Sequence, residues 1–193
     1  MKIEFVIPTF GRPDNLKVIL ASLQSQTNPN WIAHVVIDGI TNDYKEVKDW
    51  YQNEDRVKFT HLESNHNDWG HTPRNYGMEH ATEEWVVMTG DDNYYVPTFV
   101  EEFLKQSEDY LFIYCDLVHN LALGGYQPIK SQFLLSYIDI GNFMVRRKLG
   151  KNIKLKTELF DADFVYVMDY INKYIKRDTY KIKKINKVLY VHN

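Results

Sequence analysis

The chain carries, at residues 85–93, the sequence Trp85-Val86-Val87-Met88-Thr89-Gly90-Asp91-Asp92-Asn93, an apolar run that ends in an acidic turn. Four consecutive apolar residues are typical of a buried strand, and the glycine, aspartates and asparagine after them favour a turn. Pro97-Thr98 then opens an expected helix. A strand that passes through a turn into a helix is the repeating unit of parallel, helix-covered sheets.

The same alternation occurs before this stretch. We expect strands at Ile3–Ile7, Ala33–Ile37 and Val57–Leu62, with helices around Leu16–Leu23 and Tyr44–Tyr51 and a third that starts at Thr72-Pro73, with Thr72 as its N-cap. This rhythm predicts an α/β fold with a mainly parallel sheet covered by helices. Ligands of such sheets bind beyond the carboxyl ends of the strands, so the residues at those ends are the first candidates for a functional site.

The second half of the chain has a looser pattern. A strand is expected at Asn142–Arg146, a helix from about Asp161 and a last strand at Val188–Val191, which ends in His192-Asn193. The stretch from His119 to Tyr137 contains no readable motif.

Composition bounds the class of protein. The chain has 193 residues, of which 44% are hydrophobic, enough for a packed core in a single domain. Its single cysteine, Cys115, favours a reducing compartment. The N-terminal apolar run is broken by Pro8, too early for a signal peptide, and no run approaches the length of a membrane span. We therefore expect a soluble, cytoplasmic protein.

Charge is unevenly distributed along the chain. The net charge of −3 argues against a nucleic-acid binder, but the region from Arg146 to the end holds 13 Lys and Arg against 5 Asp and Glu. Such a region is usually a solvated surface. The alternative is weak attraction to an anionic acceptor or to a membrane surface.

Three groups of polar residues at strand or helix ends could carry chemistry. Asp91-Asp92 is either an ordinary polar turn or a site for Mg²⁺ or Mn²⁺, which prefer carboxylate and phosphate oxygens. Arg74, near a helix N-terminus, is either a surface arginine or a planar cation that grips a diphosphate. Asp38 is either a turn residue before Gly39 or an acceptor for a base N–H.

Taken together, four motifs resemble family 2 glycosyltransferases with the GT-A fold. They are Val6-Ile7-Pro8-Thr9-Phe10-Gly11-Arg12-Pro13, Val36-Ile37-Asp38-Gly39, the pattern Gly70-x-x-x-Arg74-Asn75-x-Gly77, and Thr89-Gly90-Asp91-Asp92-Asn93-x-x-x-Pro97. Their order and spacing both match. The resemblance implies an inverting, metal-dependent transferase that uses a nucleoside-diphosphate sugar, most commonly a UDP-sugar, and a hydroxyl acceptor such as a glycan or a lipid-linked sugar.

The resemblance also implies roles for individual residues. Gly90 stands where the first aspartate of the commonest Asp-x-Asp motif would be, so the pair that follows is similar to the family's Asp-Asp variants. The implied roles are Pro8, Thr9 and Arg12 in the nucleotide pocket, Asp38 on the base, Arg74 near the diphosphate, Asp91 near the ribose and Asp92 on Mn²⁺ or Mg²⁺.

The second half carries two weaker matches. Phe160-Asp161-Ala162-Asp163-Phe164 resembles the family's Glu-Asp motif, which implies Asp161 as catalytic base with Asp163 as the second candidate; Phe160 replaces the usual glutamate. Asp161 could instead be the N-cap of the following helix. His192 resembles the histidine that reaches the metal, or is simply exposed. We expect one GT-A domain over 1–193, with a nucleotide-sugar half at 1–110 and an acceptor half at 111–193.

Two other functions stay open at this point. A relative that binds nucleotide sugar or glycan without turnover would explain the departures at Gly90 and Phe160. A sugar-phosphate nucleotidyltransferase would need a glycine-rich basic loop after the first strand, where this chain has only Gly11 and Arg12. A dehydrogenase or methyltransferase would need a Gly-x-Gly there, which is absent. The six other histidines suggest no ligand set.

Overall fold

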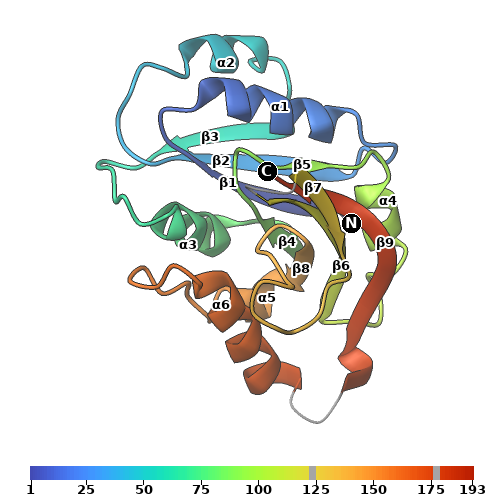
Figure 1. The fold of residues 1–193 in the computed structure, drawn as a ribbon. Coiled ribbons are helices and arrows are strands. Elements are labelled where there is room, and N and C mark those ends of the chain that lie inside the picture. Colours follow the sequence, from blue (N-terminus) through green and yellow to red (C-terminus); the bar gives the residue numbers. More distant parts are fainter. Residues whose placement is uncertain (122–124, 176–178) are drawn as a thin grey trace.

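The fold is a nine-stranded sheet with helices on both faces, as seen in a computed structural model that describes residues 1–121, 125–175 and 179–193 (Figure 1). The strand order across the described sheet is β3-β2-β1-β4-β8-β6-β9-β5, with β7 paired to β6. The strands are β1 (Ile3–Thr9), β2 (Trp31–Ile37), β3 (Val57–His61), β4 (Trp85–Met88), β5 (Tyr94–Tyr95), β6 (Phe112–Leu121), β7 (Gly125–Ile129), β8 (Phe143–Arg146) and β9 (Ile182–His192).

Helices cover the sheet from both sides. They are α1 (Pro13–Gln24), α2 (Lys45–Trp50), α3 (His71–His80), α4 (Phe99–Leu104), α5 (Arg147–Gly150) and α6 (Ala162–Tyr170), with a π-helical turn at Ile171–Ile175 and a short 3₁₀ turn at Thr179–Lys181. In Figure 1, α1 and α2 lie above the sheet, whereas α3, α5 and α6 lie below it. None of the helices in the described ranges is both long enough and apolar enough to cross a membrane.

The first half is the parallel sheet that the sequence predicts. β1 pairs in parallel with β2 and with β4, and β2 pairs in parallel with β3. Every residue of β1 and of β2 is buried, as expected for strands covered on both faces. This arrangement brings the carboxyl ends of β1, β2 and β4 to one edge of the sheet.

The second half is mixed rather than parallel. β8 lies antiparallel between β4 and β6, while β6 and β9 run parallel to each other. The sheet as a whole is therefore mixed and mostly parallel, as predicted, and its antiparallel pairings all involve strands of the second half. β9 is eleven residues long and delivers the C-terminal His192 to the same edge of the sheet that collects the ends of β1 and β4.

The start of α3 differs from the prediction. The helix begins at His71, with Gly70 as its N-cap residue in the left-handed conformation, so Thr72 and Pro73 lie inside the first turn. The carboxylate that serves the helix start belongs to Asp68, whose Oδ2 accepts hydrogen bonds from the Thr72 backbone N–H at 2.9 Å and the Thr72 hydroxyl at 2.6 Å. Spacing alone could not show this, because the capping carboxylate precedes the helix by three residues.

Two apolar clusters hold the sheet to its helices. One packs α1, α2 and α4 against the upper face and includes the fully buried Trp31 and Trp85. The other packs α3 and α6 against the lower face through Met78, Phe112 and Tyr166. Cys115 is fully buried in the first cluster, and burial raises the pKa of its thiol well above the usual range.

Candidate active site

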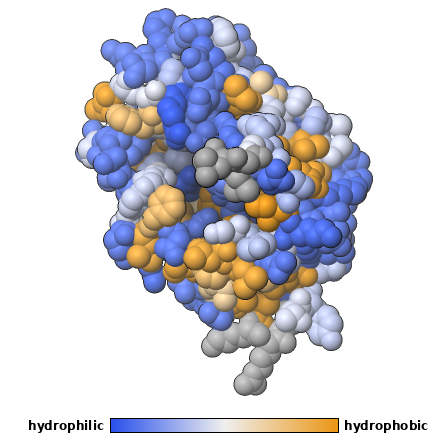
Figure 2. Space-filling view, in the orientation of Figure 1, coloured by the Kyte–Doolittle hydropathy of each residue, from blue (hydrophilic) through white to orange (hydrophobic). Residues whose placement is uncertain are grey.

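A pocket of about 810 Å³ opens at the carboxyl edge of β1, β2 and β4. Nine of the ten site residues predicted from the sequence line it: Pro8, Thr9, Arg12, Asp38, Arg74, Asp92, Asp161, Asp163 and His192. The first six come from the first half of the chain and the last three from the second. Figure 2 shows hydrophilic side chains over much of the upper half of this face and hydrophobic ones gathered below, where α6 lies.

Asp91, the tenth residue, lies behind the pocket wall. Its side chain is fully buried, and it is held by the Thr9 hydroxyl at 2.6 Å and by the Arg12 guanidinium at 2.6 Å. Burial raises the pKa of Asp91 to about 6, although the hydrogen bond from Thr9 and the charge of Arg12 lower it. In this conformation Asp91 supports the first-strand loop and presents no surface to a donor ribose.

Asp92 faces the pocket and is partly exposed. Its Oδ2 forms an ion pair with Arg12 Nη1 at 2.9 Å, so Arg12 bridges both aspartates. Gly90 is tightly enclosed, because a Cβ built there would lie 2.7 Å from Asp92 Oδ1 and 3.0 Å from Asn93 Nδ2. A side chain at position 90 would therefore displace the Asp92 carboxylate.

Arg74 is a buried cation in the pocket wall. Its side chain donates from Nε to the Thr89 carbonyl at 2.8 Å and from Nη1 to the Trp69 carbonyl at 2.8 Å. It forms no ion pair with a carboxylate within the described ranges, and burial lowers the pKa of its guanidinium. A buried charge without an ion-pair partner is costly unless a ligand supplies the opposite charge.

Asp38 ends β2 and ties it to the loop before α3. Its Oδ1 lies 2.7 Å from His66 Nδ1, and its Oδ2 accepts from the His66 backbone N–H at 3.1 Å and from Asn65 Nδ2 at 3.2 Å. These contacts fix the edge of the pocket. They also occupy both oxygens of the Asp38 carboxylate. The role predicted for Asp38, acceptance of a hydrogen bond from a base N–H, stays a prediction.

The two candidate bases both reach the pocket at the start of α6. Asp161 occupies the N-cap position, but its side chain makes no capping hydrogen bond. Asp163 Oδ1 accepts from the backbone N–H of Phe164 at 2.7 Å. Burial and, to a smaller extent, the nearby negative charge of Asp139 raise the pKa of Asp163 to about 6.

Asp139 is a functional candidate that the sequence analysis missed. Its Oδ2 forms an ion pair with His192 Nδ1 at 2.8 Å, and its Oδ1 accepts from the Tyr190 hydroxyl at 2.6 Å. Burial by itself would raise the pKa of Asp139, but His192 and these hydrogen bonds lower it to about 2. Asp139 and His192 lie 53 positions apart and meet only in the folded chain, so no local spacing could reveal the pair.

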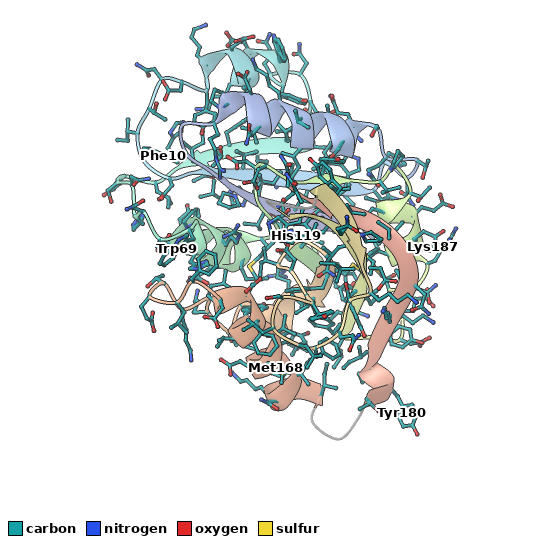
Figure 3. All side chains as sticks on the ribbon, viewed as in Figure 1. Phe10, Trp69, His119, Met168, Tyr180 and Lys187 are labelled. Atoms are coloured by element: carbon teal, nitrogen blue, oxygen red, sulfur yellow. The ribbon has the colours of Figure 1, made fainter. Side chains whose placement is uncertain are left out.

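His119 is the second residue that sequence reasoning missed. It lies on β6 opposite His192 on β9, and the two rings are 4.3 Å apart. Figure 3 places His119 near the centre of the molecule. The nearby charge of His192 and, more strongly, burial lower the pKa of His119.

The residues present fit a divalent cation that takes most of its ligands from the substrate. No group of three His, Cys, Asp or Glu side chains in the described ranges is arranged as a complete metal site. Mg²⁺ and Mn²⁺ sites in nucleotide enzymes commonly use one or two carboxylates plus phosphates and water, which Asp92 could satisfy. His192 also has the arrangement of many metal-binding histidines, with one ring nitrogen held by a carboxylate.

Comparison with curated proteins gives distant relatives. An uncharacterised glycosyltransferase of Haemophilus influenzae is 23% identical over 167 residues, which cover 82% of this chain and 54% of the relative. One of Rickettsia conorii is 26% identical over 113 residues, 58% of this chain and 18% of the relative. The chain thus spans about half or less of the length of these relatives.

Solved structures share the fold. Staphylococcus aureus TarS superimposes with a TM-score of 0.79 at 19% identity over 100% of this chain and 37% of TarS. The structure of TarS residues 1–349 in complex with UDP-GlcNAc superimposes with a TM-score of 0.76 at 22% identity, over 99% of this chain and 58% of the TarS fragment. The mannosyltransferase PcManGT of Pyrobaculum calidifontis, in complex with GDP-Man and Mn²⁺, superimposes with a TM-score of 0.66 at 14% identity. The match covers 99% of this chain and 56% of PcManGT. A family model, that of glycosyl transferase family 2, matches residues 4–167, and the chain belongs to this family.

Proposed function

We propose that this chain transfers a sugar from a nucleoside-diphosphate donor, with a UDP-sugar as the first candidate, to an acceptor hydroxyl with inversion. The observation that carries the proposal is Arg74, a buried cation that lines the pocket without a carboxylate partner in the described ranges. A donor diphosphate would supply the missing negative charge.

The two halves of the pocket would divide the substrates. Residues 1–110 would hold the donor, with its base near Asp38 and its diphosphate between Arg74 and Asp92. Residues 111–193 would face the acceptor. TarS binds UDP and UDP-GlcNAc in structures with the same fold, which favours UDP as the nucleotide to test first.

A divalent cation would be held by Asp92 and by His192, and it would offset the charge that grows on the departing diphosphate. Asp139 would act on His192 as a positioning residue, because its carboxylate holds Nδ1 and leaves the other ring nitrogen for the ligand. Asp91 would also be a positioning residue, because its carboxylate holds the Thr9 hydroxyl and the Arg12 guanidinium.

Asp163 or Asp161 would take the proton from the acceptor hydroxyl. The surroundings of Asp163 suit this role better, because a pKa of about 6 leaves the carboxylate ionised near neutral pH and still basic. Asp161 is the position that the family motif implies. Each carboxylate lines the pocket, so the choice is an experimental one.

The first test is release of nucleoside diphosphate from a panel of UDP- and GDP-sugars with and without Mn²⁺. We expect slow, metal-dependent release from at least one donor. Binding of UDP without release from any donor, even with glycan acceptors added, would favour the alternative of an inactive binding relative. If the protein neither binds UDP nor releases nucleoside diphosphate from any donor, both functions are contradicted.

A charge-matched pair of variants tests Arg74. Arg74→Met should weaken UDP binding by about 2 kcal/mol, roughly thirtyfold, because a charge-assisted contact to the diphosphate is lost. Lys154→Met removes the same charge from the exposed ion pair with Glu79 on α3 and should leave UDP binding unchanged. Isothermal titration with UDP measures both. Equal affinities for Arg74→Met and wild type would remove the main support for the proposal.

The basic region after Arg146 stays a candidate for weak attraction to an anionic acceptor or a membrane surface. Three of its lysines already have partners in this structure: Lys154 pairs with Glu79, Lys184 with Asp116 and Lys187 with Glu102, each at 2.8 Å. Binding to vesicles with and without anionic lipid would test the membrane part of this proposal.

A further inference from the structure

Two large aromatic side chains stand in solvent at the rim of the pocket. Trp69 is 56% exposed and Phe160 is 77% exposed, and both line the pocket wall. Their rings meet nearly at right angles, with centroids 5.8 Å apart and an interplanar angle of 81°. The donor half contributes Trp69 and the acceptor half contributes Phe160, so the two form an aromatic corner across the mouth of the site. Figure 3 shows Trp69 beside the start of α3.

The loop that carries Trp69 holds it outward. Trp69 has a φ of 56°, an uncommon backbone conformation for a bulky residue, and Gly70 follows with a φ of 82°. The Trp69 carbonyl accepts from Arg74 Nη1 at 2.8 Å, and the preceding Asp68 is bonded to Thr72. Bulky residues that the surrounding hydrogen bonds keep in such uncommon backbone conformations cluster at functional sites.

The two loops are also tied to each other. His71 Nε2 lies 2.9 Å from the Leu159 carbonyl oxygen, one residue before Phe160. Asn75 makes two hydrogen bonds with the backbone of Leu155, donating to its carbonyl at 2.9 Å and accepting from its N–H at 2.8 Å. The aromatic corner is therefore held in place before any ligand arrives, which lowers the entropic cost of binding.

Trp69 stands between two hollows. It lines the main pocket of about 810 Å³ and also a shallower, more open one of about 440 Å³. Polar side chains surround the second hollow, among them Asp68, Thr157 and Glu158. A chain-like ligand that enters the main pocket would pass over the aromatic corner and meet hydrogen-bonding groups beyond it.

We propose that Trp69 and Phe160 form a stacking site for a pyranose ring of the acceptor, so that the acceptor is a glycan rather than an acyclic or purely lipid alcohol. This inference rests on the proposed function. A pyranose presents one face of C–H groups, which packs on an aromatic ring, and a rim of hydroxyls, which need polar partners. Tryptophan offers a large rigid contact area at a low entropic cost, and such residues often dominate binding energy.

The test follows the four tryptophan indole N–H signals of the protein by NMR. The probes are methyl glucoside, methyl galactoside, methyl mannoside, cellobiose and chitobiose, each to about 100 mM because one stacked ring gives at best millimolar affinity. Sorbitol is the acyclic contrast. Trp69→Ala identifies the Trp69 signal. Trp50→Ala is the matched control, since Trp50 is 63% exposed on α2 and does not line either hollow.

We expect at least one pyranoside to shift the Trp69 signal and sorbitol to leave it unmoved. Trp69→Ala and Phe160→Ala should each weaken that pyranoside about tenfold, followed in Trp69→Ala by ligand-observed signals. Trp50→Ala should bind like wild type. The inference is overturned if no pyranoside moves the Trp69 signal, or if Phe160→Ala, whose exposed ring contributes little to folding, binds as well as wild type.

A parallel titration of wild type with UDP and Mn²⁺ distinguishes a failure of the acceptor inference from a failure of the proposed function. A protein that binds UDP but ignores every pyranoside contradicts the acceptor inference alone. A protein that binds pyranosides on Trp69 but no nucleoside diphosphate contradicts the proposed function and, with it, the assignment of the sugar as an acceptor.

Discussion

Gly90 stands where the commonest family motif has an aspartate, and the side chains of the next residues lie close to it. A Cβ at this position would lie 2.7 Å from Asp92 Oδ1, so an aspartate there would compete with Asp92 for one place. The acidic pair Asp91-Asp92 instead divides its work between a buried and a partly exposed carboxylate. The sequence shows that Gly90 departs from the motif, and the structure shows how closely Asp92 and Asn93 surround it.

Asp163 is the residue whose substitution should change the pH dependence. Because its pKa is raised to about 6, turnover by the wild type should rise with pH through about 6 and level off above it. Asp163→Asn should lower kcat roughly 10²–10⁴-fold and abolish that limb. The exposed Asp169→Asn on the same helix is the control and should retain the wild-type profile. If Asp161→Asn shows the loss instead, Asp161 is the base.

The Asp163→Asn substitution should lower turnover but should not lower folding stability. The pKa of Asp163 is raised in the folded state, so its ionisation opposes folding, and this cost appears as the pH rises through about 6. Asp163→Asn should therefore be at least as stable as wild type at pH 8 by urea unfolding. A less stable variant would indicate a structural role for the carboxylate.

At the scale of elements, α3 brings several parts of the site together. It places Arg74 in the pocket wall, and the loop before it positions Trp69. Its first turn depends on Asp68, a residue outside the helix. β9 has a comparable role in the second half, since it carries both Tyr190 and His192, the two residues that contact the Asp139 side chain.

Asp68→Ala should cost about 1 kcal/mol of folding stability, because it leaves the Thr72 backbone N–H without its capping oxygen. Asp68→Asn retains a side-chain oxygen and should lose only part of that amount. Chemical denaturation of the two variants measures the difference. Equal losses would show that charge, rather than the hydrogen bond, is what the helix start requires.

The whole molecule should respond to donor and cation together. At a concentration a hundredfold above its Kd, a ligand that binds only the folded state adds about 2.7 kcal/mol, which corresponds to about 5–10 °C in Tm for a domain of this size. UDP with Mn²⁺ should therefore raise Tm, and EDTA should reduce the shift. UDP with Mn²⁺ that leaves Tm unchanged at any concentration would contradict a nucleotide site. GDP serves as the comparison nucleotide.

The order of strands and helices in the first half could be predicted from the sequence because it depends on local pattern. Buried runs such as Ile3–Ile7 and Ala33–Ile37 alternate with amphipathic helices, and that alternation dictates parallel pairing with ligand residues at one edge. The four motifs at those edges identified the family before any contact was known. The mixed second half could not be predicted in the same way, because the insertion of β8 between β4 and β6 depends on long-range pairing.

The sequence by itself determined the fold class, the family and the residues that converge on the pocket. These features depend on short apolar runs and on motif spacings within one segment of the chain. Tertiary structure alone decided the state of those residues. Burial and neighbours raise the pKa of Asp163, leave Arg74 without an ion-pair partner in the described ranges, and join Asp139 to His192 across 53 positions of the chain. Asp91 and Asp92 are neighbours in the sequence, and folding makes Asp91 a buried support and Asp92 a partly exposed carboxylate.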